Sequence, residues 1–168
     1  MSKETKQSKR FKLPSKISVT KTKKSNKVPV KVYNPKFKIK QYKVTRNDGK
    51  EITINVIRDD YLIGGTKQRA MIPFFENNKS SEYVYVSPFT GAAQISLAYS
   101  AKLTNKRSVV YMIKQRPRHP LTNKALKISN YDSRIFKLIE VPNTNMKKLN
   151  RIAEKYVEET NKRKGENY

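Results

Sequence analysis

Lysine is the most abundant side chain in this sequence that could bind a ligand or act as a nucleophile. A protonated amine binds anions, and a deprotonated amine attacks carbonyl carbons. The chain holds 38 Lys and Arg against 13 Asp and Glu, a formal net charge of +25. Residues 1–50 contain 17 basic residues and only two acidic ones, Glu4 and Asp48, so this part alone carries +15. Such a density favours an acidic partner, because a polyanion relieves the self-repulsion and releases condensed counterions.

The N-terminal arm, defined as residues 1–35, is the segment predicted to bind this partner. It consists mainly of Lys, Ser, Thr, Asn and Pro, a composition too polar to bury a core by itself. Two short patches, residues 16–20 and 28–32, are predicted to dock on a partner as extended segments. The residues predicted to bind a polyanion are Lys3, Lys6, Lys9, Arg10, Lys12, Lys16, Lys21, Lys23, Lys24, Lys27 and Lys31.

Other reactive side chains are scarce. The absence of cysteine excludes disulfides, thiolate metal sites and cysteine nucleophiles. The one histidine, His119, lies among cationic residues in segment 114–120, with no neighbouring carboxylate to orient a catalytic base, so we expect a surface-loop histidine and no metal site. No apolar run reaches membrane-spanning length, and the residues after Met1 lack the apolar core of a secretion signal. We therefore expect a protein that neither spans a membrane nor is secreted.

The elements that must position these groups begin near Phe37. The alternation of Ile52, Ile54 and Val56 after an Asp-Gly turn predicts a hairpin of residues 37–46 and 50–58, with these three on a buried face. Strands are predicted at residues 83–87, 108–114 and 134–141, and helices at 91–103, 120–128 and 145–161. This order predicts an α/β fold, a small parallel sheet with helices on both faces, preceded by the hairpin and the basic arm. A single α/β domain is predicted over residues 36–162, with a C-terminal tail at 163–168.

Two blocks of the sequence resemble the fold-type II pyridoxal-phosphate enzymes. Val56-Ile-Arg-Asp-Asp-Tyr-Leu-Ile-Gly-Gly-Thr-Lys-Gln-Arg69 is similar to a strand, a Gly-Gly turn and an Asn-Lys-x-Arg helix start in the tryptophan synthase β-like superfamily. The most similar branch contains aminocyclopropane-carboxylate deaminase and D-cysteine desulfhydrase. Pro88-Phe-Thr-Gly-Ala-Ala-Gln94 is similar to the family's Ser-x-Gly-Asn-His-x-Gln loop, and the likeness covers roughly residues 50–160. The resemblance implies that Lys67 stands at the Schiff-base position.

The departures from the family's pattern imply that its chemistry has been lost. Gly91 stands in place of the asparagine that holds the cofactor ring, Ala92 in place of the histidine, and Thr66 in place of the asparagine before the lysine. The chain ends where the family's large domain, with its glycine-rich phosphate cup, should begin. As a catalyst, Lys67 would also need burial or a cationic neighbour such as Arg69 to lower its pKa. We therefore expect no cofactor and no catalytic residue, with Lys67 a vestige beside the vestigial cofactor positions Thr66, Thr90 and Gly91.

Short basic proteins of this kind resemble products of large double-stranded DNA viruses. The resemblance implies a non-enzymatic structural component of a large assembly, a minor capsid or core protein of a virion. Its partners would be other structural proteins and, through the arm, nucleic acid. Two alternatives remain open. One is a pyridoxal-phosphate-dependent lyase or deaminase completed by a partner subunit. The other is a free, intracellular nucleic-acid-binding protein without sequence preference, although the sequence holds no zinc-finger, RNP or helix-turn-helix motif.

Overall fold

The computed structural model describes residues 29–165. Ten of the eleven predicted polyanion-binding residues, those from Lys3 to Lys27, lie outside the described residues, and Lys31 lies within them. In chain order the elements are α1 (Val30–Tyr33), β1 (Ile39–Thr45), β2 (Glu51–Ile57), the 3-10 turn η1 (Asp59–Tyr61), α2 (Gln68–Asn77), β3 (Glu82–Val86), α3 (Ala93–Thr104), β4 (Arg107–Ile113), α4 (Pro120–Ile128), β5 (Phe136–Val141) and α5 (Met146–Lys164).

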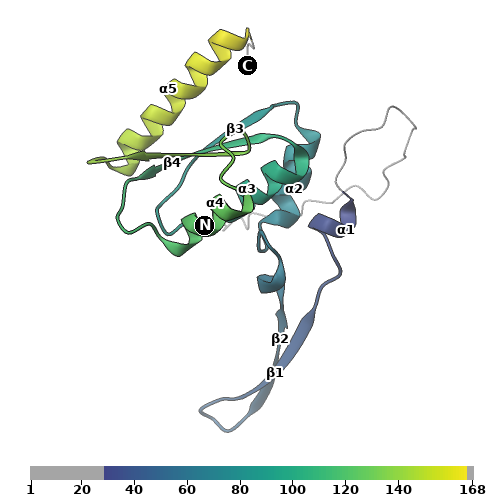
Figure 1. Ribbon diagram of the computed structural model, residues 1–168. Coiled ribbons are helices and arrows are strands. Elements are labelled where there is room, and N and C mark those ends of the chain that lie inside the picture. The colour runs from purple at the N-terminus through teal and green to yellow at the C-terminus, as the bar shows by residue number, and fades with distance from the viewer. Residues whose placement is uncertain (1–28, 166–168) are drawn as a thin grey trace, which may run out of the picture.

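The centre of the fold is a parallel sheet in the order β3-β4-β5. In its register Val84 pairs with Val109, and Val110 pairs with Leu138. The middle strand, β4, is a nearly continuous apolar run, as expected for a parallel strand that is covered on both faces. Helices α3 and α4 lie on one side of the sheet and α5 lies on the other (Figure 1). The predicted α/β fold with helices on both faces is confirmed.

Two apolar clusters fill the two faces of the sheet. On one face, Phe75 of α2 and Ala98 of α3 pack with Val110 and Phe136. On the other, Val109 and Tyr111 pack against Leu149 and Ala153 of α5. Neighbouring β4 residues enter opposite clusters because side chains alternate along a strand. The two clusters hold the sheet between its helices, and all their members lie at or after Met71.

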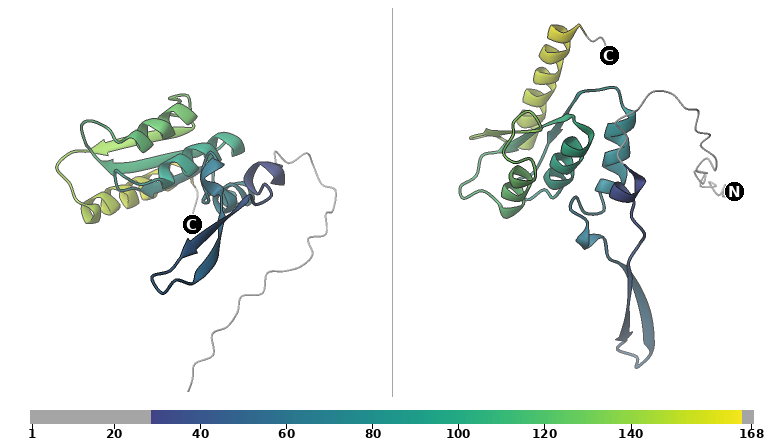
Figure 2. Two further views of the ribbon diagram at one scale, coloured as in Figure 1. Left: turned by 90° about the horizontal axis from the view of Figure 1, so that it is seen from below. Right: turned by 45° about the vertical axis from the view of Figure 1, so that its right-hand side comes forward.

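The β1–β2 hairpin has the predicted pairing but lacks the predicted burial. Tyr42 pairs with Ile54 and Val44 with Ile52, and Gly49 takes a positive φ of 79° in the turn. The hairpin projects away from the sheet and its helices (Figures 1 and 2). Ile52 and Ile54 are therefore 42% and 43% exposed, so the expectation of a buried face was wrong for both. Alternation shows that a ribbon has an apolar face, but it does not show that another element covers that face.

The segment before the hairpin also differs from its prediction. Val30–Tyr33 forms the single helical turn α1, so the extended structure predicted for residues 28–32 is wrong for residues 30–32. Pro29 precedes the turn with a φ of −55°, a value that suits a helix start. The side chain of Gln68 then fixes the turn on α2, because its Nε2 donates to the carbonyl oxygen of Val32 at 3.0 Å. This contact over 36 positions is invisible to local pattern analysis.

Candidate functional site

The positions that the enzyme resemblance singles out lie at the starts of two neighbouring helices. Thr66 and Lys67 are exposed just before α2, and Thr90 is exposed in the turn before α3. The two sequence blocks do meet, because Ser96 Oγ donates to the carbonyl oxygen of Gly64. A Cβ at Gly64 would lie only 2.8 Å from the Cβ of Gln68, so this turn needs glycine in order to pack. The structure thus joins the first block to α3, the helix that begins at the end of the second block, through a side-chain-to-backbone bond, and it leaves the Lys67 side chain in solvent.

Gly91 occupies a position with no room for the asparagine that the resemblance compares it with. A Cβ there would lie 2.5 Å from Ser87 Oγ and 2.9 Å from the carbonyl oxygen of Pro88. The same turn is closed by internal bonds, since Ser87 Oγ donates to the Pro88 carbonyl at 2.9 Å and the buried Gln94 Nε2 donates to Ser87 Oγ at 3.2 Å. The turn is built around its own polar groups, and a side chain at Gly91 would require it to rearrange.

Arg69 stands two residues after Lys67, the lysine it was expected to activate if that residue were catalytic, but its guanidinium bonds elsewhere. It donates to Asp59 Oδ1 at 2.7 Å, and it also donates to Asn34 Oδ1 at 2.7 Å and to the carbonyl oxygen of Pro35 at 2.8 Å. Its guanidinium carbon lies 4.4 Å from the centre of the Phe37 ring. The hydrogen bonds from Arg69 hold the pKa of the Asp59 carboxyl below its ordinary value. Arg69 is thus a structural tie between α2, η1 and the segment that leads into the hairpin.

Ligands usually bind at the carboxyl ends of the strands in α/β folds, and here the carboxyl end of β5 carries internal ion pairs. Glu140 of β5 accepts from Arg118 Nη2 at 2.6 Å and from Arg116 Nη1 at 3.0 Å. The hydrogen bond from Arg118 is the main reason that the pKa of Glu140 lies below its ordinary value. His119 caps α4, because its Nδ1 accepts from the Leu121 amide at 3.3 Å, so it is a helix cap rather than a free loop residue. Within residues 29–165 no cluster of His, Asp and Glu has the makeup of a metal site.

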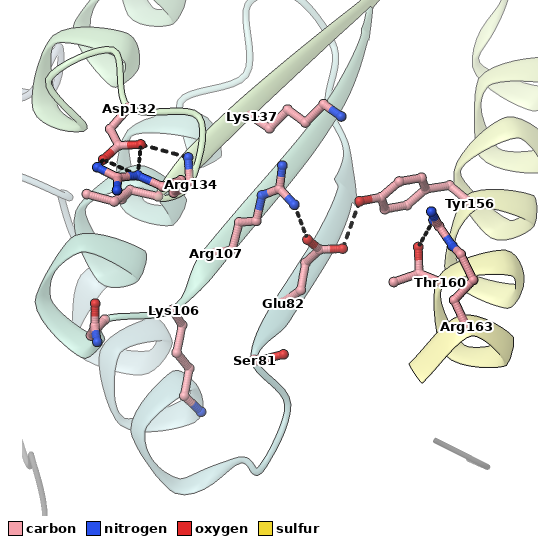
Figure 3. Close-up of a pocket in the computed structure, with 12 residues that line it drawn as sticks. Ser81, Glu82, Lys106, Arg107, Asp132, Arg134, Lys137, Tyr156, Thr160 and Arg163 are labelled. Atoms are coloured by element: carbon pink, nitrogen blue, oxygen red, sulfur yellow. Dashed lines mark hydrogen bonds and ion pairs between the residues drawn. The ribbon is translucent and has the colours of Figure 1, made fainter. Parts of the chain in front are cut away.

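A large hollow lies at the opposite, amino ends of the strands. It encloses about 850 Å³ between the starts of β3, β4 and β5 and the last turns of α5 (Figure 3). We call it the basic cleft, because five of its lining side chains are cationic and only two are carboxylates. The cations are Lys106, Arg107, Arg134, Lys137 and Arg163, and the carboxylates are Glu82 and Asp132.

Both carboxylates of the basic cleft already have arginine partners. Glu82 accepts from Arg107 Nη1 at 2.9 Å and from the Tyr156 hydroxyl at 3.0 Å, and its side chain is only 11% exposed. Asp132 pairs with Arg134 at 2.8 Å. Figure 3 shows the two pairs as separate groups, with Lys137 drawn above the Arg107 side chain. The acidic side chains therefore neutralise two of the five cations and leave an excess of positive charge.

The other three cations of the cleft, Lys106, Lys137 and Arg163, have no carboxylate partner among the described residues. Lys106 donates to the Asn78 carbonyl and to the Tyr83 hydroxyl, and partial burial lowers its pKa. Arg163 donates to Thr160 Oγ1 at 3.4 Å, within its own helix. Cations that bond only to neutral groups keep their capacity for charge-assisted bonds to an incoming anion. The arrangement is suited to binding anions.

The basic cleft was missed in the sequence analysis, although part of it could have been found. Lys106 and Arg107 stand at the start of one predicted strand and Arg134 stands at the start of the next. Amino ends of neighbouring parallel strands meet at one edge of a sheet, so these three cations could have been placed together. Tyr156 and Arg163 could not, because Tyr156 reaches Glu82 across 74 positions of the chain.

Comparison of the chain with protein-family models, with curated proteins and with solved structures found no match. The site is therefore interpreted from its own geometry. The helices described between Pro29 and Gly165 include none with the length and apolar character needed to cross a bilayer.

Proposed function

We propose that this protein is a non-enzymatic structural component of a large assembly, in which its arm and its basic cleft bind acidic partners, above all nucleic acid. The observation that carries the proposal is the surplus of cations in the cleft, where Lys106, Lys137 and Arg163 lack carboxylate partners among the described residues. The ten basic residues before Pro29 add to the same charge. The resemblance to proteins of large DNA viruses makes a virion the assembly that we propose, with this chain as a minor capsid or core protein.

A polyanion suits the basic cleft better than a small anion does. The cations without a carboxylate partner come from different elements: Lys137 lies on β5, Arg163 lies near the end of α5, and Lys106, whose amine bonds to Asn78 and Tyr83, lies before β4. Charges spread around a hollow of about 850 Å³ match a chain of phosphates better than one phosphate group. Tyr156 is half-buried, its ring packs against Tyr111 and its hydroxyl donates to Glu82, so it is held in place as part of the fold. Binding should therefore depend on the phosphate backbone and be indifferent to base sequence.

The geometry around Lys67 supports a non-enzymatic role. The side chain is exposed, whereas a Schiff-base lysine needs a site that excludes water and positions a cofactor. Gly91 has no space for the ring-holding asparagine. The buried carboxylate of Asp59 is bound by Arg69, which stabilises its ionised form and makes it a poor proton carrier. The alternative of an enzyme completed by a partner subunit would require that subunit to supply nearly all of the site.

Binding to nucleic acid can be tested by fluorescence anisotropy. Two labelled DNA strands of unrelated sequence are titrated with the full chain at several salt concentrations. We expect equal affinity for both strands and a steep loss of affinity with salt. Replacing the ten basic residues before Pro29 by glutamine should remove most of the binding and flatten the salt dependence. If this variant binds like the unmodified protein at low and moderate salt, the arm is only a solubility tail and the proposal is wrong.

The contribution of the cleft has its own variant and control. Lys137→Gln with Arg163→Gln should weaken binding by about three- to tenfold at moderate salt, because two phosphate contacts are lost. Lys147→Gln with Lys148→Gln removes the same charge near the start of α5, roughly 24 Å from Arg163 along the helix. This control should weaken binding less. Equal effects of the two variants would show that only total charge matters and that the cleft has no special role.

The assembly itself is tested in native particles. Mass spectrometry of purified virions or other large particles from the source should find the chain at fixed stoichiometry. Cross-links from arm lysines to neighbouring proteins would support the structural role. Recovery of the chain only in the free, nucleic-acid-bound fraction would favour the alternative of a free nucleic-acid-binding protein.

A further inference from the structure

The sheet has an open edge at β3. On its inner side β3 pairs with β4 over its whole length, and no described strand pairs with its outer side. The Ser81 carbonyl accepts from the Arg107 amide, and the Ser87 amide donates to Tyr111, so the odd-numbered residues of this segment bond toward β4. Backbone groups alternate in direction along a strand.

The alternation leaves three residues of β3 facing outward. The amides and carbonyls of Glu82, Val84 and Val86 point away from β4, and no other element within residues 29–165 bonds to them. Unpaired backbone groups of this kind form a template to which an extended segment can add. The outer edge of β3 thus offers the hydrogen bonds of a missing fourth strand.

A groove follows this edge between α2 and α5. It consists of two hollows of about 280 Å³ and 410 Å³, and Val84 and Val157 line both, which makes the groove continuous along β3. Phe74 at the end of α2 forms one wall and is 56% exposed. We call this feature the edge groove. A groove with an apolar lining beside open strand edges fits a strand better than it fits a small molecule.

The α5 wall of the edge groove is apolar and acidic. Ala153 and Val157 face the hollow, and Glu154 and Glu158 line it as well. Neither glutamate has an ion-pair partner among the described residues, unlike Glu159, which pairs with Lys155. In a chain with a net charge of +25, an acidic surface beside an open strand edge selects for a basic strand.

We propose that residues 16–21 of the arm, Lys-Ile-Ser-Val-Thr-Lys, add to the outer edge of β3 as a fourth strand. The segment alternates in the way a strand requires, and it is rich in β-branched residues. Ile17, Val19 and Lys21 share one face, which matches an α5 wall that carries both apolar residues and glutamates. The arm's other apolar patch is unavailable, because Val30–Tyr33 is already folded as α1. This inference deepens the proposed function, since it divides the arm into an anchored strand and a free basic end before it.

The chain is long enough for an arm to reach the edge groove of its own molecule. The arm leaves the described structure at Pro29, next to α1, which is bonded to the first turn of α2 at Gln68. The groove begins at Phe74 and Asn78, at the other end of α2, and ten helical residues span about 15 Å. Residues 21–29 in extended form span roughly 30 Å, about twice that length.

Hydrogen exchange with residue-level mass spectrometry on the full chain tests the proposal. We expect the amides of Val84 and Val86 to be protected. In the double variant Ser18→Pro/Val19→Pro, the Val84 and Val86 amides should exchange at least about tenfold faster. Two adjacent prolines remove one backbone N–H donor from each side of the added strand. Gln7→Pro with Ser8→Pro is the matched control, since it places two prolines elsewhere in the arm, and it should leave the protection intact. Both variants keep every charge.

Three results would overturn the inference. Val84 and Val86 could exchange freely in the unmodified chain, their protection could persist in the Ser18→Pro/Val19→Pro variant, or the control could abolish it too. Protection that persists and rises with protein concentration would assign the groove to a second copy of the chain. The DNA titration on the same samples keeps the two proposals apart. If the unmodified chain does not bind DNA but the Val84 and Val86 amides are protected, only the proposed function is contradicted. If the chain binds DNA but these amides exchange freely, only the fourth strand is contradicted.

The absence of cysteine allows a further measurement. Val19→Cys with Val157→Cys should form a disulfide on mild oxidation, because the proposed strand turns Val19 toward the α5 wall, which contains Val157. A cross-linked monomer shows that the arm pairs within its own molecule, and a cross-linked dimer shows that copies exchange arms. Both products support the fourth strand.

Discussion

Arg69 Nη2 lies 2.7 Å from Asp59 Oδ1, and the two side chains are only 12% and 9% exposed. The same guanidinium also bonds to Asn34 and to the Pro35 carbonyl. One buried ion pair therefore connects the start of α2, the turn η1 after the hairpin and the end of the arm at residues 30–35, which we call the root of the arm. Removal of this ion pair should therefore lower the thermal stability of the fold.

Asp59→Asn should lower Tm by several degrees at neutral pH. The pKa of Asp59 is depressed in the folded protein, so its stabilising effect is complete above its ordinary pKa near 3.8 and is lost as the pH falls through the lower folded-state value. The difference in Tm between Asp59→Asn and the unmodified chain should therefore shrink in strong acid. Thermal melts across the acid range measure it. Asp60→Asn is the control, because Asp60 and its partner Arg58 are 60% and 41% exposed, and an exposed pair contributes little. Equal losses in both variants would contradict the prediction.

Truncation should distinguish the arm from its root. Deleting residues 1–28 should leave a cooperative melt, because both core clusters lie at or after Met71. Deleting residues 1–35 should also leave a cooperative melt, but at a lower Tm, because Gln68 and Arg69 lose their acceptors at Val32, Asn34 and Pro35. A buried donor left without its partner costs about 1–3 kcal/mol. Circular dichroism checks both variants, and a non-cooperative melt after the shorter deletion would refute the predicted domain boundary.

Two isoleucine-to-alanine variants test whether the hairpin face is as exposed as the structure has it. Ile54→Ala should reduce the free energy of unfolding by less than about 1 kcal/mol, because Ile54 is already 43% exposed. Ile72→Ala removes the same atoms from a fully buried site and should cost about 2–5 kcal/mol. Urea denaturation gives both values. A large loss for Ile54→Ala would mean that the hairpin face is covered in solution.

Lys67→Ala should change neither DNA binding nor thermal stability, because the side chain is exposed and has no partner that folding depends on. The unmodified chain mixed with pyridoxal phosphate should also fail to develop the visible absorbance of a stoichiometric internal aldimine. Lys124→Ala, another exposed lysine, is the control for nonspecific adducts. A stable adduct at Lys67 that is absent from the Lys67→Ala variant would favour the enzyme alternative.

The sequence predicted the parallel sheet and helices α3, α4 and α5 well because their signals are local, whereas α2 was not among the helices predicted from periodicity. The apolar run of β4, Pro120 at the start of α4 and the apolar stripe of α5 each lie within one element. The hairpin followed in the same way from its Asp-Gly turn. Its exposure did not, because the solvation of Ile52 and Ile54 depends on whether a distant element covers them.

The candidate site was less predictable because its parts are far apart in the chain. The lysine-rich arm is evident from composition alone, whereas the basic cleft combines Glu82, Arg107 and Tyr156 from three elements. Likewise, α1 follows from Gln68 bonding to Val32, a contact that residues 28–32 do not encode themselves.

The root of the arm also determines which bonds bear the force when the arm is pulled. Three hydrogen bonds, from Gln68 to Val32 and from Arg69 to Asn34 and Pro35, connect one short stretch of chain to the first turn of α2. Because they lie next to one another, a pull on the arm strains them together rather than one after another. The force then passes along α2, whose Ile72 and Phe75 are anchored in the interior. The hairpin begins after these bonds and so lies outside the path of the force, and a pull on the arm does not separate β1 from β2.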